Sequence, residues 1–109
     1  MRLALYGILR PGATHHHEVR SISGTWEAGT VRGWCHEITW GPADGFDGIT
    51  LDPDAPPVAV DILHSDDLPR HLDRLDRFEG PGYRRVTTTA RLPDGTDVAV
   101  EIYEADPEA

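Results

Sequence analysis

This sequence contains a single cysteine, no lysine and no long hydrophobic run. Because Cys35 has no second cysteine to pair with, an internal disulfide cannot form, which favours a reducing compartment. The apolar stretch at the N-terminus contains Gly7 and then reaches Arg10 and Pro11 at once. It is therefore too short for the apolar region of a signal peptide and for a membrane span. We expect a cytoplasmic protein that does not cross a membrane.

The charge of the chain is strongly negative. Its 109 residues include 19 acidic and 10 basic side chains, all of the latter arginine, for a formal net charge of −9. A surface of this sign repels phosphate backbones and argues against nucleic acid as a partner. With 39% hydrophobic and 27% charged residues, the composition is that of a globular protein. We predict one domain over residues 1–109, with a frayed tail at residues 105–109.

Strand-like patterns occupy most of the chain. They fall at residues 2–7, 23–40, 49–51, 58–63, 83–92 and 96–104. The short third strand lies within a long loop over residues 41–57, and a loop of this length in a compact domain is often functional. The last two strands flank a Pro-Asp-Gly turn at residues 93–95, which predicts a hairpin.

One clear helix is predicted over residues 65–79. Its apolar residues Leu68, Leu72, Leu75 and Phe78 form a single stripe. Ser65 or Asp67 can cap its start, Pro69 is tolerated in its first turn, and Gly80 ends it. The arginines at 70, 74 and 77, with the acids at 73 and 76, are expected to form a salt-bridged outer face. The elements together predict an α+β fold with a mixed or antiparallel sheet that can curl into a barrel.

Glu79 is the last residue of this helix. A carboxylate at the negative end of the helix dipole is disfavoured in its charged form by about 0.3–1 kcal/mol. Partial burial beside Phe78 and Tyr83 would raise its pKa further and make it a better base. Taken alone, however, the position favours an ordinary solvated carboxylate paired with a neighbouring arginine, because catalytic carboxylates are rare.

The turn after the first strand has glycines at both ends, Gly7 and Gly12. Glycine allows a ligand to approach the backbone, and successive N–H groups there can bind a carboxylate or a developing oxyanion. Local chemistry by itself favours an ordinary turn at this point.

Taken together, two motifs are more specific. They are YGILRPG (residues 6–12), followed by histidines, and LDRLDRFEGPGYRR (residues 72–85). This pair resembles the gamma-glutamylcyclotransferase-like family, whose members open with a YGTLR-G-like motif and later carry LD-x-x-EG followed by Tyr-x-Arg. The resemblance covers nearly the whole chain. It implies a small mixed β-barrel with one main helix and short outer helical segments.

The resemblance also implies an activity. Members of the family convert a gamma-glutamyl amine or peptide to 5-oxoproline and a free amine, with no metal or other cofactor. Glu79 falls on the family's general base. The positions that fall on its substrate-binding residues are Tyr6, Gly7, Ile8, Leu9, Arg10, Tyr83 and Arg85. A small gamma-glutamyl compound would be the substrate, and the protein would act as a monomer or homodimer.

Two departures from the family pattern concern the substrate. Ile8 replaces the usual threonine or serine and removes a hydroxyl from the loop. The Gly-Glu dipeptide common in the middle strand is absent from residues 58–62, where Asp61 is the acid that could stand in for it. Two other functions remain open: another acyl-transfer or hydrolytic reaction on a small amide, and a binding module for a small carboxylated ligand. A mere binder would not need Glu79 at its position.

Other reactive side chains have simpler interpretations. The run at residues 15–17 is three histidines, but consecutive residues do not converge on one metal ion. Cys35 and its neighbours His36 and Glu37 would alternate between the faces of a strand, so we expect a buried structural thiol. The remaining histidines are expected to be surface or packed side chains, and the three tryptophans, Trp26, Trp34 and Trp40, to be core aromatics.

Overall fold

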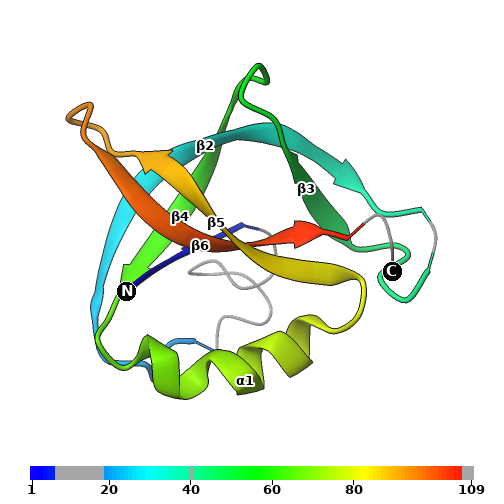
Figure 1. The fold of residues 1–109 in the computed structure, drawn as a ribbon, viewed down its shortest axis with the longest axis horizontal. Coiled ribbons are helices and arrows are strands. Elements are labelled where there is room, and N and C mark those ends of the chain that lie inside the picture. Colours follow the sequence, from blue (N-terminus) through cyan, green and yellow to red (C-terminus); the bar gives the residue numbers. More distant parts are fainter. Residues whose placement is uncertain (7–18, 40, 107–109) are drawn as a thin grey trace.

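The computed structural model describes residues 1–6, 19–39 and 41–106 of the chain. Within these described ranges, six strands and one helix follow one another (Figure 1). Their bounds are β1 Arg2–Leu5, β2 Thr25–Glu37, β3 Asp47–Leu51, β4 Pro57–His64, α1 Leu68–Glu79, β5 Tyr83–Arg91 and β6 Asp97–Ala105. Every strand predicted from the sequence is present, within a few residues of the predicted bounds. The predicted Gly7–Arg10 loop, the histidines at 15–17, Trp40 and residues 107–109 lie outside the described residues.

Five of the strands form a closed barrel. The order β2-β4-β1-β6-β5 closes through a pairing of β5 with β2 at Arg91 and Thr30. All neighbouring strands are antiparallel except β1 and β6, which run parallel through Leu3–Glu101 and Ala4–Ile102. This confirms the predicted α+β class and the mixed β-barrel. The additional outer helical segments that were expected do not occur among the described residues, where α1 is the only helix.

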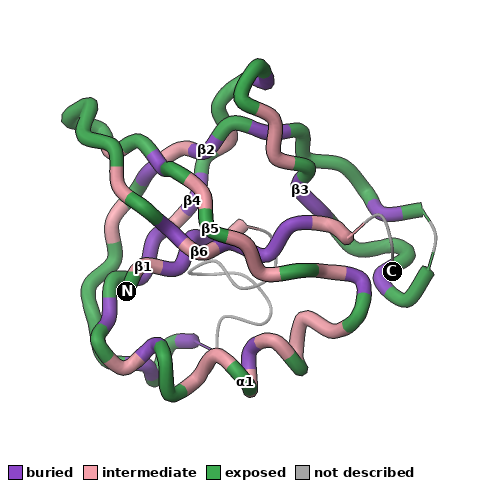
Figure 2. The backbone as a smooth tube through the Cα atoms, in the orientation of Figure 1, coloured by how far each residue is buried: buried purple, intermediate pink, exposed green. Residues whose placement is uncertain are grey.

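β1 is buried on both faces because it runs through the middle of the fold. Leu3 and Leu5 point into a cluster shared with α1, while Ala4 points into the interior of the barrel. This alternation explains the uninterrupted apolar sequence of the strand. Burying a leucine contributes about 1.5–3 kcal/mol, so the two leucines hold the helix firmly on the barrel. The three residues Leu3, Ala4 and Leu5 are all buried, and further buried segments lie on the strands around them (Figure 2).

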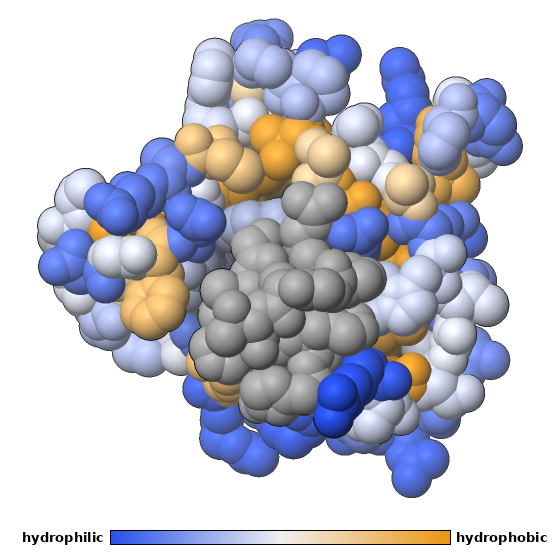
Figure 3. Space-filling view, turned by 180° about the vertical axis from the view of Figure 1, so that it is seen from behind, coloured by the Kyte–Doolittle hydropathy of each residue, from blue (hydrophilic) through white to orange (hydrophobic). Residues whose placement is uncertain are grey.

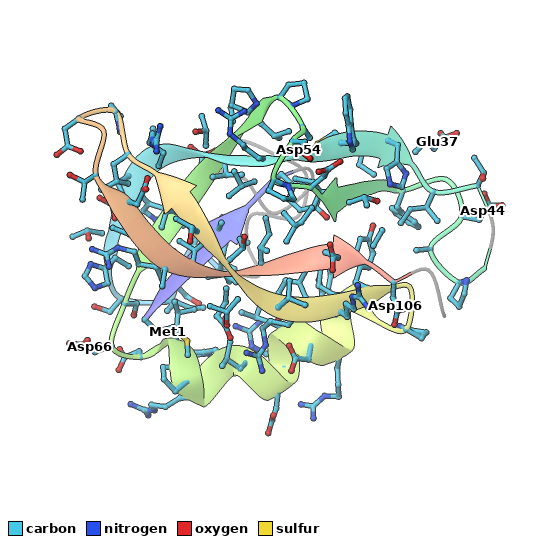
Figure 4. All side chains as sticks on the ribbon, turned by 45° about the horizontal axis from the view of Figure 1, so that its top comes forward. Met1, Glu37, Asp44, Asp54, Asp66 and Asp106 are labelled. Carbon is cyan, nitrogen blue, oxygen red and sulfur yellow. The ribbon has the colours of Figure 1, made fainter. Side chains whose placement is uncertain are left out.

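The helix lies against one side of the barrel. Leu68 and Leu75 are fully buried. Asp67 occupies the N-cap position without a side-chain cap, and the Ser65 hydroxyl instead accepts a hydrogen bond of 3.0 Å from the Asp67 N–H. The helix ends as predicted at Gly80, whose φ of 77° favours glycine. The chain start lies beside the helix start, where Met1 and Asp66 are neighbours in Figure 4 and the Ser65 N–H donates to the Met1 carbonyl at 2.9 Å.

β3 extends the sheet beyond the barrel. It pairs with the end of β2 and lies beside β6 without a backbone ladder between them. Two side chains bridge this gap. The Tyr6 hydroxyl donates to the Tyr103 carbonyl and accepts from the Ile49 N–H at 3.0 Å, and the buried Glu104 carboxylate accepts from the Leu51 N–H at 3.0 Å. These bonds satisfy strand groups that a ladder would otherwise pair.

Two predictions about side chains on β2 were wrong. Trp26 and Trp34 are 37% and 51% exposed, because they lie on the outer face of the strand. Cys35 is also exposed, although it shares the inward direction of Val31 and Gly33. The pairing of β2 with β4 stops at Arg32, so beyond this point β3 is the only strand paired with β2 among the described residues, and the thiol is left exposed.

Seen from behind, the surface is predominantly hydrophilic around its rim, and hydrophobic residues are visible mainly in the upper half of the view (Figure 3). No helix in the described ranges is long and apolar enough to cross a membrane.

Candidate active site

A cavity of about 300 Å³ lies where the end of α1, the end of β1 and the start of β5 meet. Its apolar lining consists of Ala4, Leu5, Pro42, Ala43, Phe46 and Phe78. Its polar lining consists of Tyr6, Asp47, Glu79, Tyr83 and Tyr103. A largely apolar pocket with a few convergent polar groups is the usual form of a small-molecule site.

The fold brings these segments together through the packing of α1. Leu68 and Leu75 pack in the same cluster as Leu3 and Leu5 of β1, so the C-terminal turn of the helix reaches the end of that strand. The chain then turns at Gly80 and starts β5 beside the same cavity. Residues more than 70 positions apart in the sequence thereby share one wall.

Glu79 is partly buried in this cavity. Among the described residues, no hydrogen bond or ion pair holds its carboxylate. Burial raises the pKa of Glu79 from 4.5 to about 7, because removal from water disfavours the charged form. A carboxyl group with this pKa can both accept and return a proton near neutral pH.

Three tyrosine rings line the cavity around Glu79, but their hydroxyls bind the protein itself. Tyr6 donates to the Tyr103 carbonyl, Tyr83 donates to the Asp47 carbonyl at 2.6 Å, and Tyr103 donates to Asp76 at 2.6 Å. Burial raises the pKa of Tyr83 to about 12, and it raises the pKa values of Tyr6 and Tyr103 above their usual range. The phenols therefore stay protonated and shape the cavity, while Glu79 is left to titrate.

Arg85 does not line the cavity. Its Nε donates to Asp76 Oδ1 at 3.0 Å, and its Nη1 donates to Glu101 at 2.6 Å. The prediction that Asp76 belongs to an outer salt-bridged face was wrong, because Asp76 binds Arg85 and Tyr103 on the barrel side of the helix. Burial works against its ionisation, but the hydrogen bonds from Arg85 and Tyr103 hold the pKa of Asp76 below its usual value.

The segment of residues 42–47 supplies a wall that no motif revealed. Pro42, Ala43 and Phe46 line the cavity, and Phe46 is 51% exposed. The segment rests on Gly82, where a Cβ atom would lie only 2.2 Å from the Cβ of Ala43. The signal available in the sequence was the length of the loop over residues 41–57, which indicated a function without indicating which residues carry it.

Of the site residues predicted from the sequence, the cavity unites Tyr6, Glu79 and Tyr83. Asp61 lies on β4 opposite Leu5 and is not part of the lining. In the described ranges, no group of three His, Cys, Asp or Glu side chains could hold a metal ion.

The chain matches known proteins at the level of family and fold. A family model described as "Gamma-glutamyl cyclotransferase, AIG2-like" matches residues 3–109. No curated protein matches this sequence.

Several solved structures share the fold. An AIG2-like protein from Mus musculus has a TM-score of 0.66 at 18% identity, over 98% of this chain and 80% of that one. A structure titled "Gamma-glutamyl cyclotransferase" has a TM-score of 0.64 at 15% identity, over 97% of this chain and 66% of that one. YkqA from Bacillus subtilis has a TM-score of 0.69 at 20% identity, and although 96% of this chain is covered, it spans only 35% of YkqA.

Proposed function

The chain belongs to the gamma-glutamyl cyclotransferase, AIG2-like family, and on this basis we propose that it converts a gamma-glutamyl amine or peptide to 5-oxoproline and a free amine. The observation that carries the proposal is the partly buried Glu79 carboxyl group in the cavity, with a pKa raised to about 7. A base poised near the working pH is what the reaction requires.

In the proposed reaction, Glu79 accepts a proton from the α-ammonium group of the substrate. The free amine attacks the γ-carbonyl carbon and closes a five-membered ring. The bond from this carbon to the departing nitrogen then breaks, and the Glu79 carboxyl group returns the proton to that nitrogen. The ring nitrogen gives up its second proton, which the released amine takes up to become an ammonium ion. Atoms balance without a further reactant, because the nucleophile and the electrophile belong to one molecule.

Tyr6 and residues 7–10 are the proposed cradle of the gamma-glutamyl group. Tyr6 ends the described part of this segment and lines the same cavity as Glu79, which supports the proposal. Backbone N–H groups after it would bind the α-carboxylate or the oxyanion. The Tyr83 ring forms another wall. For Arg85 we propose a positioning role through Asp76, in place of substrate contact, because its guanidinium is already held by two carboxylates.

The test is release of 5-oxoproline from gamma-glutamyl compounds by the native protein and by Glu79→Gln. The amide keeps the size of the side chain but cannot act as a base, so we expect the rate to fall about 10²–10⁴-fold. Glu37→Gln is the matched control, because Glu37 is an exposed carboxylate at the end of β2 (Figure 4). Equal rates for native protein and Glu79→Gln would end the proposal.

We also propose a cytoplasmic location, which the single cysteine supports. The substrate is the partner proposed for this site.

A further inference from the structure

Phe46 is a large aromatic side chain left half in solvent at the wall of the cavity. It is 51% exposed, while Tyr103 at the same cavity is buried. The difference indicates that Phe46 lies at the mouth and Tyr103 at the base. Pro42 and Ala43 extend this apolar surface from the same segment. Contiguous exposed apolar surface at a cavity often marks a ligand-binding site, whereas single exposed apolar residues elsewhere on a surface are ordinary.

The segment is held in place before any ligand binds. The Ile38 N–H donates to the Phe46 carbonyl at 2.8 Å, and the Gly45 N–H donates to the Ile38 carbonyl at 2.8 Å. The Phe46 N–H donates to the Ala43 carbonyl at 3.0 Å, and Ala43 packs on Gly82. The Phe46 ring therefore stands on a fixed backbone, as a recognition surface requires.

The charged groups among the described residues that line the cavity all have one sign. Among its described lining residues there is no arginine or histidine, and the ionisable carboxyl groups are Asp47 and Glu79. The chain as a whole carries a formal charge of −9. A carboxylate brought to the mouth would lose hydrating water, and no cationic side chain among the described lining residues would compensate for that loss.

We propose that residues 42–47 form a subsite for the departing amine, and that this subsite selects amines with an uncharged apolar substituent over amines that carry a carboxylate. The inference rests on the proposed cyclotransferase function and narrows its substrate from gamma-glutamyl amine or peptide to apolar gamma-glutamyl amines. Phe46 is the specificity-determining residue, since it offers the largest apolar surface at the mouth.

Two physical effects give this selectivity. An aryl or alkyl group on the departing amine buries apolar area against Phe46 and Pro42. A carboxylate on the same amine would lie near Asp47 and Glu79, where like charges repel. It would also raise the pKa of Glu79 further and so reduce the fraction of active base at neutral pH.

The test compares three compounds: gamma-glutamyl phenethylamide, gamma-glutamyl phenylalanine, which differs from it by one carboxylate, and gamma-glutamyl methylamide, which is too small to reach Phe46. We expect kcat/KM for the phenethylamide to exceed that for gamma-glutamyl phenylalanine about tenfold or more. Phe46→Ala should lower kcat/KM for the phenethylamide about tenfold more than for the methylamide. Trp34→Ala is the matched control, because Trp34 is equally exposed but lies outside the cavity.

The outcomes separate the two proposals. Turnover of all three compounds with equal kcat/KM, or an equal loss for all three in Phe46→Ala, would overturn the subsite and leave the cyclotransferase function standing. No 5-oxoproline from any of the three would overturn the proposed function, and the subsite with it.

Discussion

The Tyr103 hydroxyl donates a hydrogen bond of 2.6 Å to Asp76, and Asp76 lies one helical turn before Glu79. Arg85 completes the link by donating to Asp76 and to Glu101 of β6. The last turn of α1 is thus tied to two barrel strands, β5 and β6, on the barrel side of the helix. Charge-assisted bonds of this kind restrict orientation more than a single apolar contact does. The link explains how a helix end can present Glu79 at a constant position.

Loss of this link should reduce turnover more than binding. In Asp76→Asn we expect kcat to fall several-fold with little change in KM, since Glu79 keeps its chemistry but loses its fixed position. The free energy of unfolding should fall by about 1–3 kcal/mol, because bonds to a charged group are lost. Steady-state kinetics and urea unfolding measure the two effects. Asp73→Asn is the control, because Asp73 is exposed on the same helix and lies outside the cavity lining. Identical kinetics in the two variants would contradict the positioning role.

The pH dependence of activity should report the titration of Glu79. In the proposed mechanism Glu79 acts as a base only when it is deprotonated, and burial raises its pKa to about 7. We therefore expect kcat/KM to rise as pH increases from about 6 to 8, with its midpoint near the pKa of the free enzyme. A midpoint near 4.5, the ordinary value, would show that Glu79 is solvated in the active protein.

The same pKa shift should make stability depend on pH. The folded state holds a proton on Glu79 up to about pH 7, whereas the unfolded chain releases it near 4.5. The folded state therefore binds more protons in this window, and the contribution of Glu79 to stability falls as pH rises through it. In Glu79→Gln, which cannot ionise, the free energy of unfolding relative to the native protein should rise by about 1–3 kcal/mol between pH 4.5 and pH 8. Urea unfolding at the two pH values measures the difference. A constant difference would contradict burial of the carboxyl group.

A methyl group at position 82 should displace the segment that carries Phe46. In Gly82→Ala the new Cβ would lie 2.2 Å from the Cβ of Ala43, so the segment must move. We expect KM to rise and the free energy of unfolding to fall by about 1–3 kcal/mol. Gly95→Ala is the control, because Gly95 has a φ of 89° in the distant hairpin with open space around it. It should lose stability through backbone strain without a change in KM. An unchanged KM in Gly82→Ala would separate the segment from the substrate.

The hydroxyl of Tyr6 should matter to stability more than to catalysis. In Tyr6→Phe the buried Ile49 N–H loses its acceptor and the Tyr103 carbonyl loses a donor. We expect a loss of about 1–3 kcal/mol in the free energy of unfolding. The ring remains in the cavity, so kcat should stay within about threefold of the native value, below the effect of removing a catalytic group. Thermal unfolding and 5-oxoproline release would measure both. A loss of activity comparable with that of Glu79→Gln would place the hydroxyl in the chemistry.

Local pattern was a sound guide wherever a residue's environment follows from its neighbours in the chain. The stripe through Leu68 and Leu75 predicted the helix, Gly80 predicted its end, and the Pro-Asp-Gly turn predicted the last hairpin. The local pattern failed where β2 continues beyond the end of its pairing with β4. Cys35 has the parity of a buried residue, but nothing in the sequence tells that β4 stops pairing with β2 at Arg32.

The sequence by itself determined the family, the class of fold and Glu79 as the candidate base, because these depend on motifs and on short-range periodicity. Only the tertiary structure decided the surroundings of that carboxyl group. Phe46 lines the cavity, and the Tyr6 and Tyr83 hydroxyls donate to backbone carbonyls. Arg85 binds Asp76 and does not line the cavity. These relations depend on strand register and on the docking of α1, which bring together groups that share no local pattern.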